Sequence, residues 1–376
     1  MTEAKPRSRV LAVGALGPLS PSFRVRTLIP AHEIAHHGVE LMHHPLFTAE
    51  EDARFQGARA AKRLSIILGS RRRLVRRLRE DDALDAVLVQ RQADMLPVLR
   101  LERLAASGRR LILDIDDAIW HDSSRAAGGH PLAALKGSRR KVRWLAERAE
   151  AVIAGNELLA EWLQAYSERV SVVPSLVDPE RIPIRRHEQA DRVLLGWIGS
   201  RSTAPSLAVL REPLERLARS SRGRRFELLA VGGEAPNVQG MDCRSEPWSE
   251  PREQRFLAEI DIGLMPLPDT PWSRGKCAYK ALQYMAAGIP VVADDVGVSA
   301  AVIGHGAAGL VAGRDGGWAD HLAELAGNAE LRARLGAAGR RRVEEGFSVK
   351  RWAPMLAGIL RGDSAGAGRD VRIAPA

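Results

Sequence analysis

The chain has 376 residues and a formal net charge of +10, from 56 basic and 46 acidic residues. This length exceeds one hydrophobic core of ordinary size, so we expect two domains. Although the charge would suit nucleic-acid binding, only seven of the basic residues are lysines, aromatic residues make up 5% of the chain, and no zinc-finger or RNA-binding motif occurs. We therefore expect no nucleic-acid partner.

The cysteines and the apolar segments bear on the compartment. Cys243 and Cys277 are too few for a disulfide framework and lack the second pair of a structural zinc site, which favours a reducing cytoplasm. The apolar start of the chain is typical of a first strand, and no stretch is long and apolar enough to cross a bilayer. The sequence predicts a cytoplasmic protein that is soluble or, at most, peripheral on the inner face of a membrane.

Short apolar runs alternate with helical patterns along the chain, as in parallel sheets joined by crossover helices. After a first strand, a helix is expected near Arg26 to His37. A proline- and charge-rich segment, residues 173–191, separates two sets of strands. The predicted strands lie at residues 9–14, 39–44, 85–90, 110–116, 151–155, 170–175, 192–200, 226–233, 261–267, 289–294 and 308–313.

This pattern predicts an α/β fold with two Rossmann-like, doubly wound domains that face an interdomain cleft. We place the N-terminal domain at residues 1–185 and the C-terminal domain at residues 186–362, with a last helix that can pack back on the N-terminal domain. Residues 363–376 are small and polar, which predicts a disordered tail. Because ligands of open parallel sheets bind beyond the carboxyl ends of the strands, we look for sites in those loops.

Three aspartates crowd the end of the predicted strand at residues 110–116. Side-chain alternation would place Asp114 and Asp116 on one face, with Asp117 pointing differently. Like charges this close are costly unless they are solvated, paired or used in chemistry. Together with His121, Asp117 could bind hydroxyl groups or take a proton. Capping of a following helix and a metal site are the alternatives.

The loop at residues 199–203, GSRST, follows the first strand of the second half. Its backbone N–H groups and the N-terminus of a following helix would form a site for phosphate oxygens. Ser202, Thr203 and Arg201 would add side-chain donors. Ordinary helix capping by serine is the alternative. Neither a P-loop nor a dinucleotide-binding fingerprint is present.

Lys276, Lys280 and Gln283 follow one another at i, i+4 and i+7 ahead of Gly288 and an apolar strand. On a helix these side chains would lie within about 60° of one another and form one polar stripe. The two lysines and the loop at 199–203 would then clamp a diphosphate. A solvated helix face is the alternative.

The order of these segments is similar to that of GT-B glycosyltransferases, in the large retaining family four (group 1) of nucleotide-sugar enzymes. The segment QYMAAGIPVV, residues 283–292, resembles the family's EAMACGxPVV, and VVPSLVD, residues 172–178, resembles its VIPNGVD interdomain turn. The resemblance implies two Rossmann-like domains, an acceptor in the N-terminal half, a nucleotide-sugar in the C-terminal half and no required metal.

Some positions depart from the family pattern. The family usually carries two glutamates eight positions apart, where this chain has Gly275 and Gln283. Gln283 can still hydrogen-bond a ribose hydroxyl, but Gly275 cannot replace a carboxylate that would contact the donor sugar. The family's arginine and lysine pair is also altered, with Arg201 present and Pro205 near the expected lysine.

The resemblance implies a retaining glycosyltransferase that needs neither metal nor cofactor, with a UDP- or GDP-linked sugar as donor and a small molecule or lipid-linked acceptor. Lys276 and Lys280 would stabilise charge on the leaving diphosphate, and Asp117 would orient the acceptor. A nucleotide-sugar epimerase and a non-catalytic partner of another transferase are the alternatives. We assign donor binding to Gly199, Ser200, Arg201, Ser202, Thr203, Lys276, Lys280 and Gln283, and acceptor binding to Arg24, Asp114, Asp116, Asp117 and His121.

A basic segment, residues 62–80, carries eight positive side chains and one negative one. On a helix its apolar side chains would fall along one side, interrupted by Arg71. This pattern predicts a surface for anionic lipid. A helix that covers its sheet with solvated arginines is the alternative. The apolar side comprises Leu64, Ile67, Leu68, Val75 and Leu78.

Overall fold

The computed structural model describes residues 8–121, 137–220, 223–313 and 317–363. The chain divides into two compact units. Unit 1 contains the chain up to Leu176, the short segment Gly275–Cys277 and the C-terminal segment that begins at Val349; unit 2 contains Val177–Arg274 and Ala278–Ser348. The predicted disordered tail lies outside the described residues, apart from Asp363.

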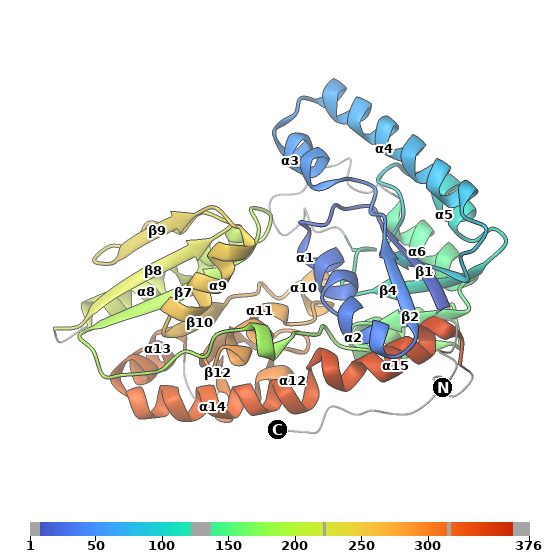
Figure 1. The fold of residues 1–376 in the computed structure, drawn as a ribbon. Coiled ribbons are helices and arrows are strands. Elements are labelled where there is room, and N and C mark those ends of the chain that lie inside the picture. Colours follow the sequence, from blue (N-terminus) through green and yellow to red (C-terminus); the bar gives the residue numbers. More distant parts are fainter. Residues whose placement is uncertain (1–7, 122–136, 221–222, 314–316, 364–376) are drawn as a thin grey trace. The chain divides into compact units, whose positions relative to one another are not determined.

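Unit 1 contains a six-stranded parallel sheet with the strand order β2-β1-β3-β4-β5-β6 (Figure 1). The strands are β1 Ser8–Gly14, β2 Val39–His43, β3 Ala86–Gln90, β4 Arg110–Ile115, β5 Ala151–Ala154 and β6 Val170–Val172. The helices are α1 Pro21–Phe23, the π-helix η1 Arg24–Leu28, α2 Ala31–His36, α3 Ala49–Gly57, α4 Ala60–Glu80, α5 Arg100–Ala105, α6 Ser138–Ala146, α7 Glu157–Gln164 and α15 Val349–Arg361.

Unit 2 contains a second six-stranded parallel sheet, with the order β12-β11-β10-β7-β8-β9. The strands are β7 Arg192–Ile198, β8 Arg225–Val231, β9 Asp242–Glu246, β10 Ile262–Met265, β11 Val291–Asp294 and β12 Gly309–Ala312. The helices are the 3-10 helices η4 Pro179–Arg181 and η5 Ala204–Leu210, and α8 Arg211–Arg219, α9 Glu250–Glu259, α10 Pro271–Arg274, α11 Tyr279–Ala286, α12 Ser299–Ile303, α13 Trp318–Gly327 and α14 Ala329–Gly346.

The strand orders confirm the predicted α/β fold with two doubly wound sheets. The order reverses between β1 and β3 in unit 1, and between β7 and β10 in unit 2. In open parallel sheets, ligands bind at such switch points, beyond the carboxyl ends of the strands. The loops after β1 and β3 in unit 1 and after β7 and β10 in unit 2 are therefore the places where sites are expected, and the loop after β4 lies next to the first pair.

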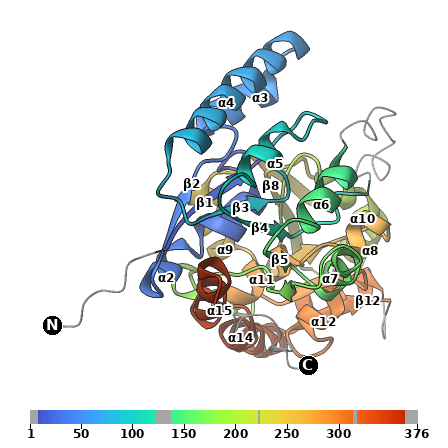
Figure 2. The ribbon, with the colours of Figure 1, turned by 90° about the vertical axis from the view of Figure 1, so that its right-hand side faces the viewer.

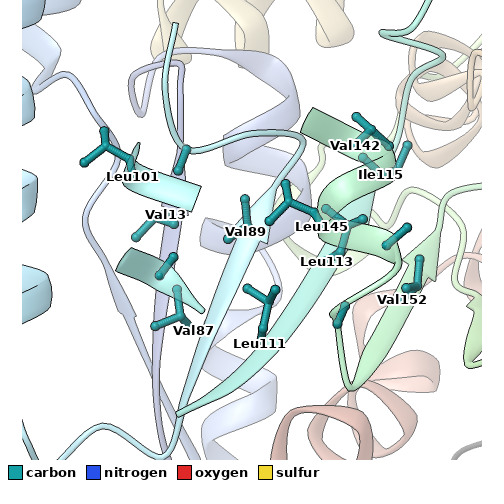
Figure 3. Packing of buried hydrophobic residues seen from close by; sticks show 14 of the residues in the cluster. Val13, Val87, Val89, Leu101, Leu111, Leu113, Ile115, Val142, Leu145 and Val152 are labelled. Atoms are coloured by element: carbon teal, nitrogen blue, oxygen red, sulfur yellow. The ribbon is translucent and has the colours of Figure 1, made fainter. Parts of the chain in front are cut away.

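The sheet of unit 1 is buried on both faces because its strands are nearly continuous apolar runs. Alternate residues of β4 point to opposite faces. Leu111 and Leu113 belong to a core cluster that also contains Leu101 of α5 and Leu145 of α6 (Figure 3). Ile112 belongs instead to a cluster with Trp352 and Leu356 of α15. The last helix therefore completes the core of unit 1, and it lies beside α2 (Figures 1 and 2).

Helix α4 corrects one prediction, because its apolar residues do not share one exposed side. Ile67 and Leu78 are buried in the core of unit 1, whereas Leu64 and Leu68 are 49% and 45% exposed. With successive residues about 100° apart, Leu64 and Leu68 lie about 60° and 100° from Ile67. In both views α3 and α4 lie side by side, and the first half of α4 extends beyond the sheet (Figures 1 and 2).

Several arginines of α4 are engaged in ion pairs and so are less available to bind anionic lipid than their number suggests. Arg71 pairs with Asp94 at 3.3 Å, Arg73 with Glu51 at 2.6 Å, and Arg77 with Asp81 at 2.6 Å. These ion pairs tie the helix to its own unit. Within the described part of the chain, no helix is both long and apolar enough to span a membrane.

Candidate functional site

A network of charged side chains lies at the carboxyl ends of β3 and β4. Asp114, in β4, accepts hydrogen bonds from Arg26 Nε at 3.0 Å and from Nη2 at 2.7 Å. Arg26 Nη1 donates to the carbonyl oxygens of Val173 and Pro174 at 2.9 and 2.7 Å. Burial would lower the pKa of Arg26, but the Asp114 carboxylate raises it above its usual value. Asp114 is thus committed to a buried ion pair.

Arg91 joins the other two aspartates of the network. Its Nε donates to Asp116 Oδ1 at 2.6 Å, and its Nη2 donates to Asp117 Oδ2 at 3.2 Å. Gln90 Nε2 also donates to Asp116, at 2.9 Å. Burial would raise the pKa of Asp116, but Arg91 outweighs this effect and the pKa is lowered. The strand β4 ends at Ile115, so the predicted alternation does not extend to Asp116 and Asp117.

The backbone of Arg91 has an unusual conformation. Its φ is +63°, in the left-handed region that non-glycine residues rarely adopt. The Arg91 N–H donates to the Asp114 carbonyl at 2.8 Å, which holds the turn after β3 in place. Such strain costs about 1–3 kcal/mol and is concentrated at functional sites. Arg91 was not predicted as a site residue, although polar residues directly after the buried strand AVLVQ were a usable signal.

Asp117 offers a position for a ligand. The residue is only 5% exposed, and its Oδ2 accepts a hydrogen bond from Lys276 Nζ at 3.2 Å as well as that from Arg91. Its Oδ1 is buried, and no group of the described residues donates a hydrogen bond to it. Buried carboxylate oxygens are normally hydrogen-bonded. The geometry therefore suits a ligand hydroxyl that donates to Oδ1.

The segment Gly275–Cys277 is held in unit 1 by Asn156, the N-cap of α7. Asn156 Oδ1 accepts from the Leu159 N–H at 2.9 Å, while its Nδ2 donates to the Gly275 and Lys276 carbonyls at 3.1 and 3.3 Å. Cys277 Sγ donates to the Asp116 carbonyl at 3.2 Å. Burial raises the pKa of Cys277 to about 12, so this thiol stays protonated and acts as a packing group.

The prediction of one helical stripe is therefore wrong. Helix α11 begins at Tyr279, after Ala278, whose φ of +51° breaks the helical path. Lys276 precedes the helix and belongs to unit 1, whereas Lys280 and Gln283 belong to α11 in unit 2. Gln283 is 4% exposed and faces the helix's buried side. The spacing i, i+4, i+7 was misleading because the residues do not share one helix.

Gly275, which stands where the family usually has a glutamate, has a steric reason to be glycine. A Cβ at this position would lie 2.5 Å from the Ala118 Cβ and 3.1 Å from the Ala118 backbone nitrogen. Real Cβ atoms essentially never approach other heavy atoms to 2.5 Å. The docking of this segment on the loop after β4 therefore excludes a larger side chain.

In unit 2, the loop at 199–203 differs from the predicted phosphate cradle. The N–H of Gly199 donates to the Val231 carbonyl at 3.0 Å, that of Ser200 to Thr203 Oγ1 at 3.1 Å, and that of Thr203 to the Ser200 carbonyl at 2.9 Å. The segment that follows is the 3-10 helix η5 in place of the expected α-helix. Three of the five backbone donors are thus already bonded within the protein. Arg201 and Ser202 point exposed side chains from it.

Trp197 connects this loop with Lys280. Its indole is fully buried at the end of β7, and its ring carbons would lie 2.4 Å from a Cβ at Gly199. Lys280 Nζ lies 5.3 Å from the centroid of the Trp197 ring, within the range of a cation–π contact. The Lys280 ammonium and the 199–203 loop therefore lie around one side chain at the carboxyl end of β7.

Tyr284 marks the switch point of unit 2, where β7 and β10 separate. Its hydroxyl accepts from the Ile198 N–H at 3.1 Å and donates to the Leu264 carbonyl at 3.4 Å. A Cβ at Gly263 would lie 2.3 Å from the tyrosine ring. Burial raises the pKa of Tyr284, so the hydroxyl remains a donor. The side chain replaces strand hydrogen bonds and fixes the end of β7 that carries the loop.

The remaining two predicted acceptor residues lie at the margins of the unit 1 network. Arg24 is half-buried in the π-helix η1, two residues before Arg26. His121 is exposed and directly precedes residues outside the described part of the chain. Partial burial lowers the pKa of His121, and the nearby Arg139 adds to this effect. The roles of Arg24 and His121 in acceptor binding stay predictions.

Solved structures share this fold over nearly the whole chain. Sucrose-phosphate synthase from Thermosynechococcus elongatus aligns with a TM-score of 0.69 and 14% identity, covering 96% of this chain and 100% of that one. Anabaena Alr3699/HepE, solved with UDP and glucose, aligns with a TM-score of 0.63 and 13% identity, covering 95% of this chain and 100% of that one. WaaG, a glycosyltransferase involved in lipopolysaccharide biosynthesis, aligns with a TM-score of 0.60 and 15% identity, covering 94% of this chain and 100% of that one. A comparison with curated proteins finds no match.

These likenesses show that the fold is the GT-B fold. Within it, residues 192–328, which form much of unit 2, match the family model described as glycosyl transferases group 1. The matched segment contains the loop at 199–203, Lys280, Gln283 and Tyr284. This match over unit 2 agrees with the resemblance that the sequence motifs indicated.

Proposed function

We propose that this protein transfers a sugar from a nucleoside-diphosphate sugar to an acceptor hydroxyl, with retention of anomeric configuration and without a metal ion. The observation that carries the proposal is the arrangement of Lys280 and the 199–203 loop around Trp197, at the end of β7 within the matched segment. A diphosphate at this place could pair with the Lys280 ammonium and the Arg201 guanidinium, and it could accept hydrogen bonds from the hydroxyls of the loop. The UDP bound by Anabaena Alr3699/HepE supports UDP as the first nucleotide to test.

The mechanism follows from where charge develops. As the bond between sugar and phosphate breaks, negative charge grows on the leaving phosphate and the sugar becomes oxocarbenium-like. Fixed cations stabilise that phosphate charge, which is the role we assign to Lys280. Asp117 Oδ1 accepts a hydrogen bond from a substrate hydroxyl and orients it. In front-face attack the leaving phosphate itself takes the acceptor proton, so no second carboxylate flanking the bond is needed.

Donor binding is the first prediction. In calorimetry, UDP or GDP should bind at about millimolar concentration, and EDTA should leave the Kd unchanged. Arg201→Ala should weaken binding about tenfold, because an exposed guanidinium beside a phosphate makes charge-assisted hydrogen bonds. The matched control is Arg211→Ala, an exposed arginine of α8 that pairs with Glu215. The donor assignment is wrong if neither nucleotide binds or if both variants weaken binding equally.

Product analysis separates the proposal from its alternatives. A transferase consumes donor only when an acceptor is added, whereas an epimerase converts the nucleotide-sugar alone. A non-catalytic partner binds the nucleotide without turnover. NMR of the anomeric proton of the product tests retention, and an inverted product would refute that part of the proposal.

We also propose that the acceptor is lipid-linked and that the first half of α4 contacts an anionic membrane. Leu64 and Leu68 are exposed one turn apart, on the part of α4 that extends beyond the sheet. Exposed Lys62 and Arg72 lie near them in the sequence. An apolar pair flanked by cations suits an interface with anionic headgroups.

Vesicle sedimentation tests this surface and gives the second prediction. The protein should pellet with vesicles that contain phosphatidylserine more than with phosphatidylcholine vesicles at low salt. Leu64→Asp together with Leu68→Asp should abolish the difference, because buried apolar area and charge both decrease. The matched control is Leu158→Asp, which changes a 43% exposed leucine of α7 in the same unit. Equal pelleting with both vesicle types would exclude the membrane contact.

A further inference from the structure

Two histidines and a glutamate on α2 form a cluster that the glycosyltransferase site does not use. The ligand atoms of His32, Glu33 and His36 all lie within 4.8 Å of one another. The Nε2 atoms of the two histidines are 3.4 Å apart, and the ring centroids are 4.9 Å apart. Both histidines are exposed, and Glu33 is half-buried. Among the described residues, this is the cluster whose donor atoms could hold a metal ion.

The distance between the two nitrogens matches metal coordination. Zinc binds histidine nitrogen at about 2.0–2.1 Å, so two nitrogens on a tetrahedral ion are about 3.3–3.4 Å apart. The same distance fits a hydrogen bond between two neutral imidazoles, one of which donates to the other. A metal ion would replace that hydrogen bond with little movement of either ring. Imidazole nitrogen with one carboxylate is a donor set typical of zinc and similar divalent transition metals.

Helix α2 is anchored to the core on the side opposite the two histidines. Ile34 is buried, and His32 and His36 lie two residues before and after it, about 160° around the helix. The side chain that fixes α2 to the core thus turns both histidines outward. At the end of the helix, Arg361 of α15 donates a hydrogen bond to the His37 carbonyl. Both contacts therefore fix the position of the backbone that carries the cluster.

We propose that α2 carries a site for a divalent transition-metal ion of the zinc class, ligated by Nε2 of His32, Nε2 of His36 and the carboxylate of Glu33, with water completing the coordination. Helix α2 leads directly into the start of β2, whereas Asp116 and Asp117 lie at the carboxyl ends of the parallel strands. The ion is thus separate from the transfer chemistry. A six-residue helix is marginal by itself, so a ligand that links i and i+4 stabilises α2.

Calorimetry with zinc chloride and the untagged protein tests the site. We expect one zinc ion to bind and magnesium not to bind, since magnesium prefers oxygen ligands. His36→Ala should weaken zinc binding at least about tenfold, because it removes one of two nitrogen ligands. The matched control is His37→Ala, which alters the next histidine of the chain, outside the cluster, and should keep the Kd within about twofold.

Cobalt(II) provides a second readout that does not depend on heats of binding. The parent protein and His37→Ala should give the visible absorption of a histidine-bound cobalt ion, and His36→Ala should lose it. Circular dichroism checks that each variant is folded, as expected because His32 and His36 are exposed and His37 is only half-buried. The proposal is overturned if the parent binds no zinc, or if His32→Ala and His36→Ala bind it as tightly as the parent.

Discussion

Replacing Lys280 with alanine is expected to lower kcat about 100-fold, a loss of about 2.7 kcal/mol of transition-state stabilisation, while the protein stays folded. The ammonium lies at the end of β7, where we propose that the leaving diphosphate binds, and its charge matters most when the phosphate becomes more negative. Lys280→Arg should not restore the rate fully, because a wide planar guanidinium cannot reproduce a compact ammonium. Steady-state kinetics with a donor already shown to bind measures the effect.

A second substitution separates charge from packing at this position. Lys280→Met keeps an apolar stem against Trp197 but removes the cation, so it should lose as much kcat as Lys280→Ala. Lys350→Ala, which changes an exposed lysine of α15 in the other unit, serves as the control and should keep the parent kcat. If Lys280→Met turns over at the parent rate, Lys280 stabilises the indole and not the leaving group.

Introducing the family glutamate, Gly275→Glu, should destabilise the protein by about 3 kcal/mol or more and reduce activity rather than raise it. The new Cβ would overlap the Ala118 Cβ at 2.5 Å, and the carboxylate would enter a buried segment. Lys276 would be displaced with its segment, and its 3.2 Å contact with Asp117 would be lost. Urea unfolding and turnover measured on the same preparations test both parts.

A pair of smaller changes checks that the cause is steric. Gly275→Ala alone should destabilise the protein by about 1–3 kcal/mol. Combined with Ala118→Gly, which removes the opposing methyl group, it should cost less than the sum of the two single changes, since contacting sites are not additive. Higher activity of Gly275→Glu at unchanged stability would mean instead that the segment can move and that the missing carboxylate limits the reaction.

Most of the fold could be predicted because buried parallel strands are apolar runs that stand out in the sequence. The strand β9 was missed because its sequence, DCRSE, is polar and largely exposed at the edge of the sheet. On α4, periodicity alone could not show which apolar residues face the core. Ile67 is buried and Leu68 is exposed because their side chains point about 100° apart around the helix.

The site was harder to predict because its contacts join residues far apart in the sequence. The three aspartates were identified, but the sequence does not show that Arg26 and Arg91 pair with them, because both arginines are far from the aspartates along the chain. Lys276 was assigned to a helix because the sequence does not reveal the left-handed backbone of Ala278. Alanine is an unfavourable residue for that conformation and a favourable one for a helix, so local propensity predicted that the helix continues through Ala278.

The C-terminal helix has a consequence for the order in which the chain can fold during translation. Residues of α15 fill one face of the unit 1 sheet, and Gly275–Cys277 is held beside α7, so unit 1 is discontinuous in sequence. The ribosome releases both of these segments only after most of unit 2 has been made. Until then the face of the nascent sheet around Val10 and Ile112 lacks its cover, which is a state prone to aggregation. Unit 2 can therefore reach its final core before unit 1 does, although it is synthesised later.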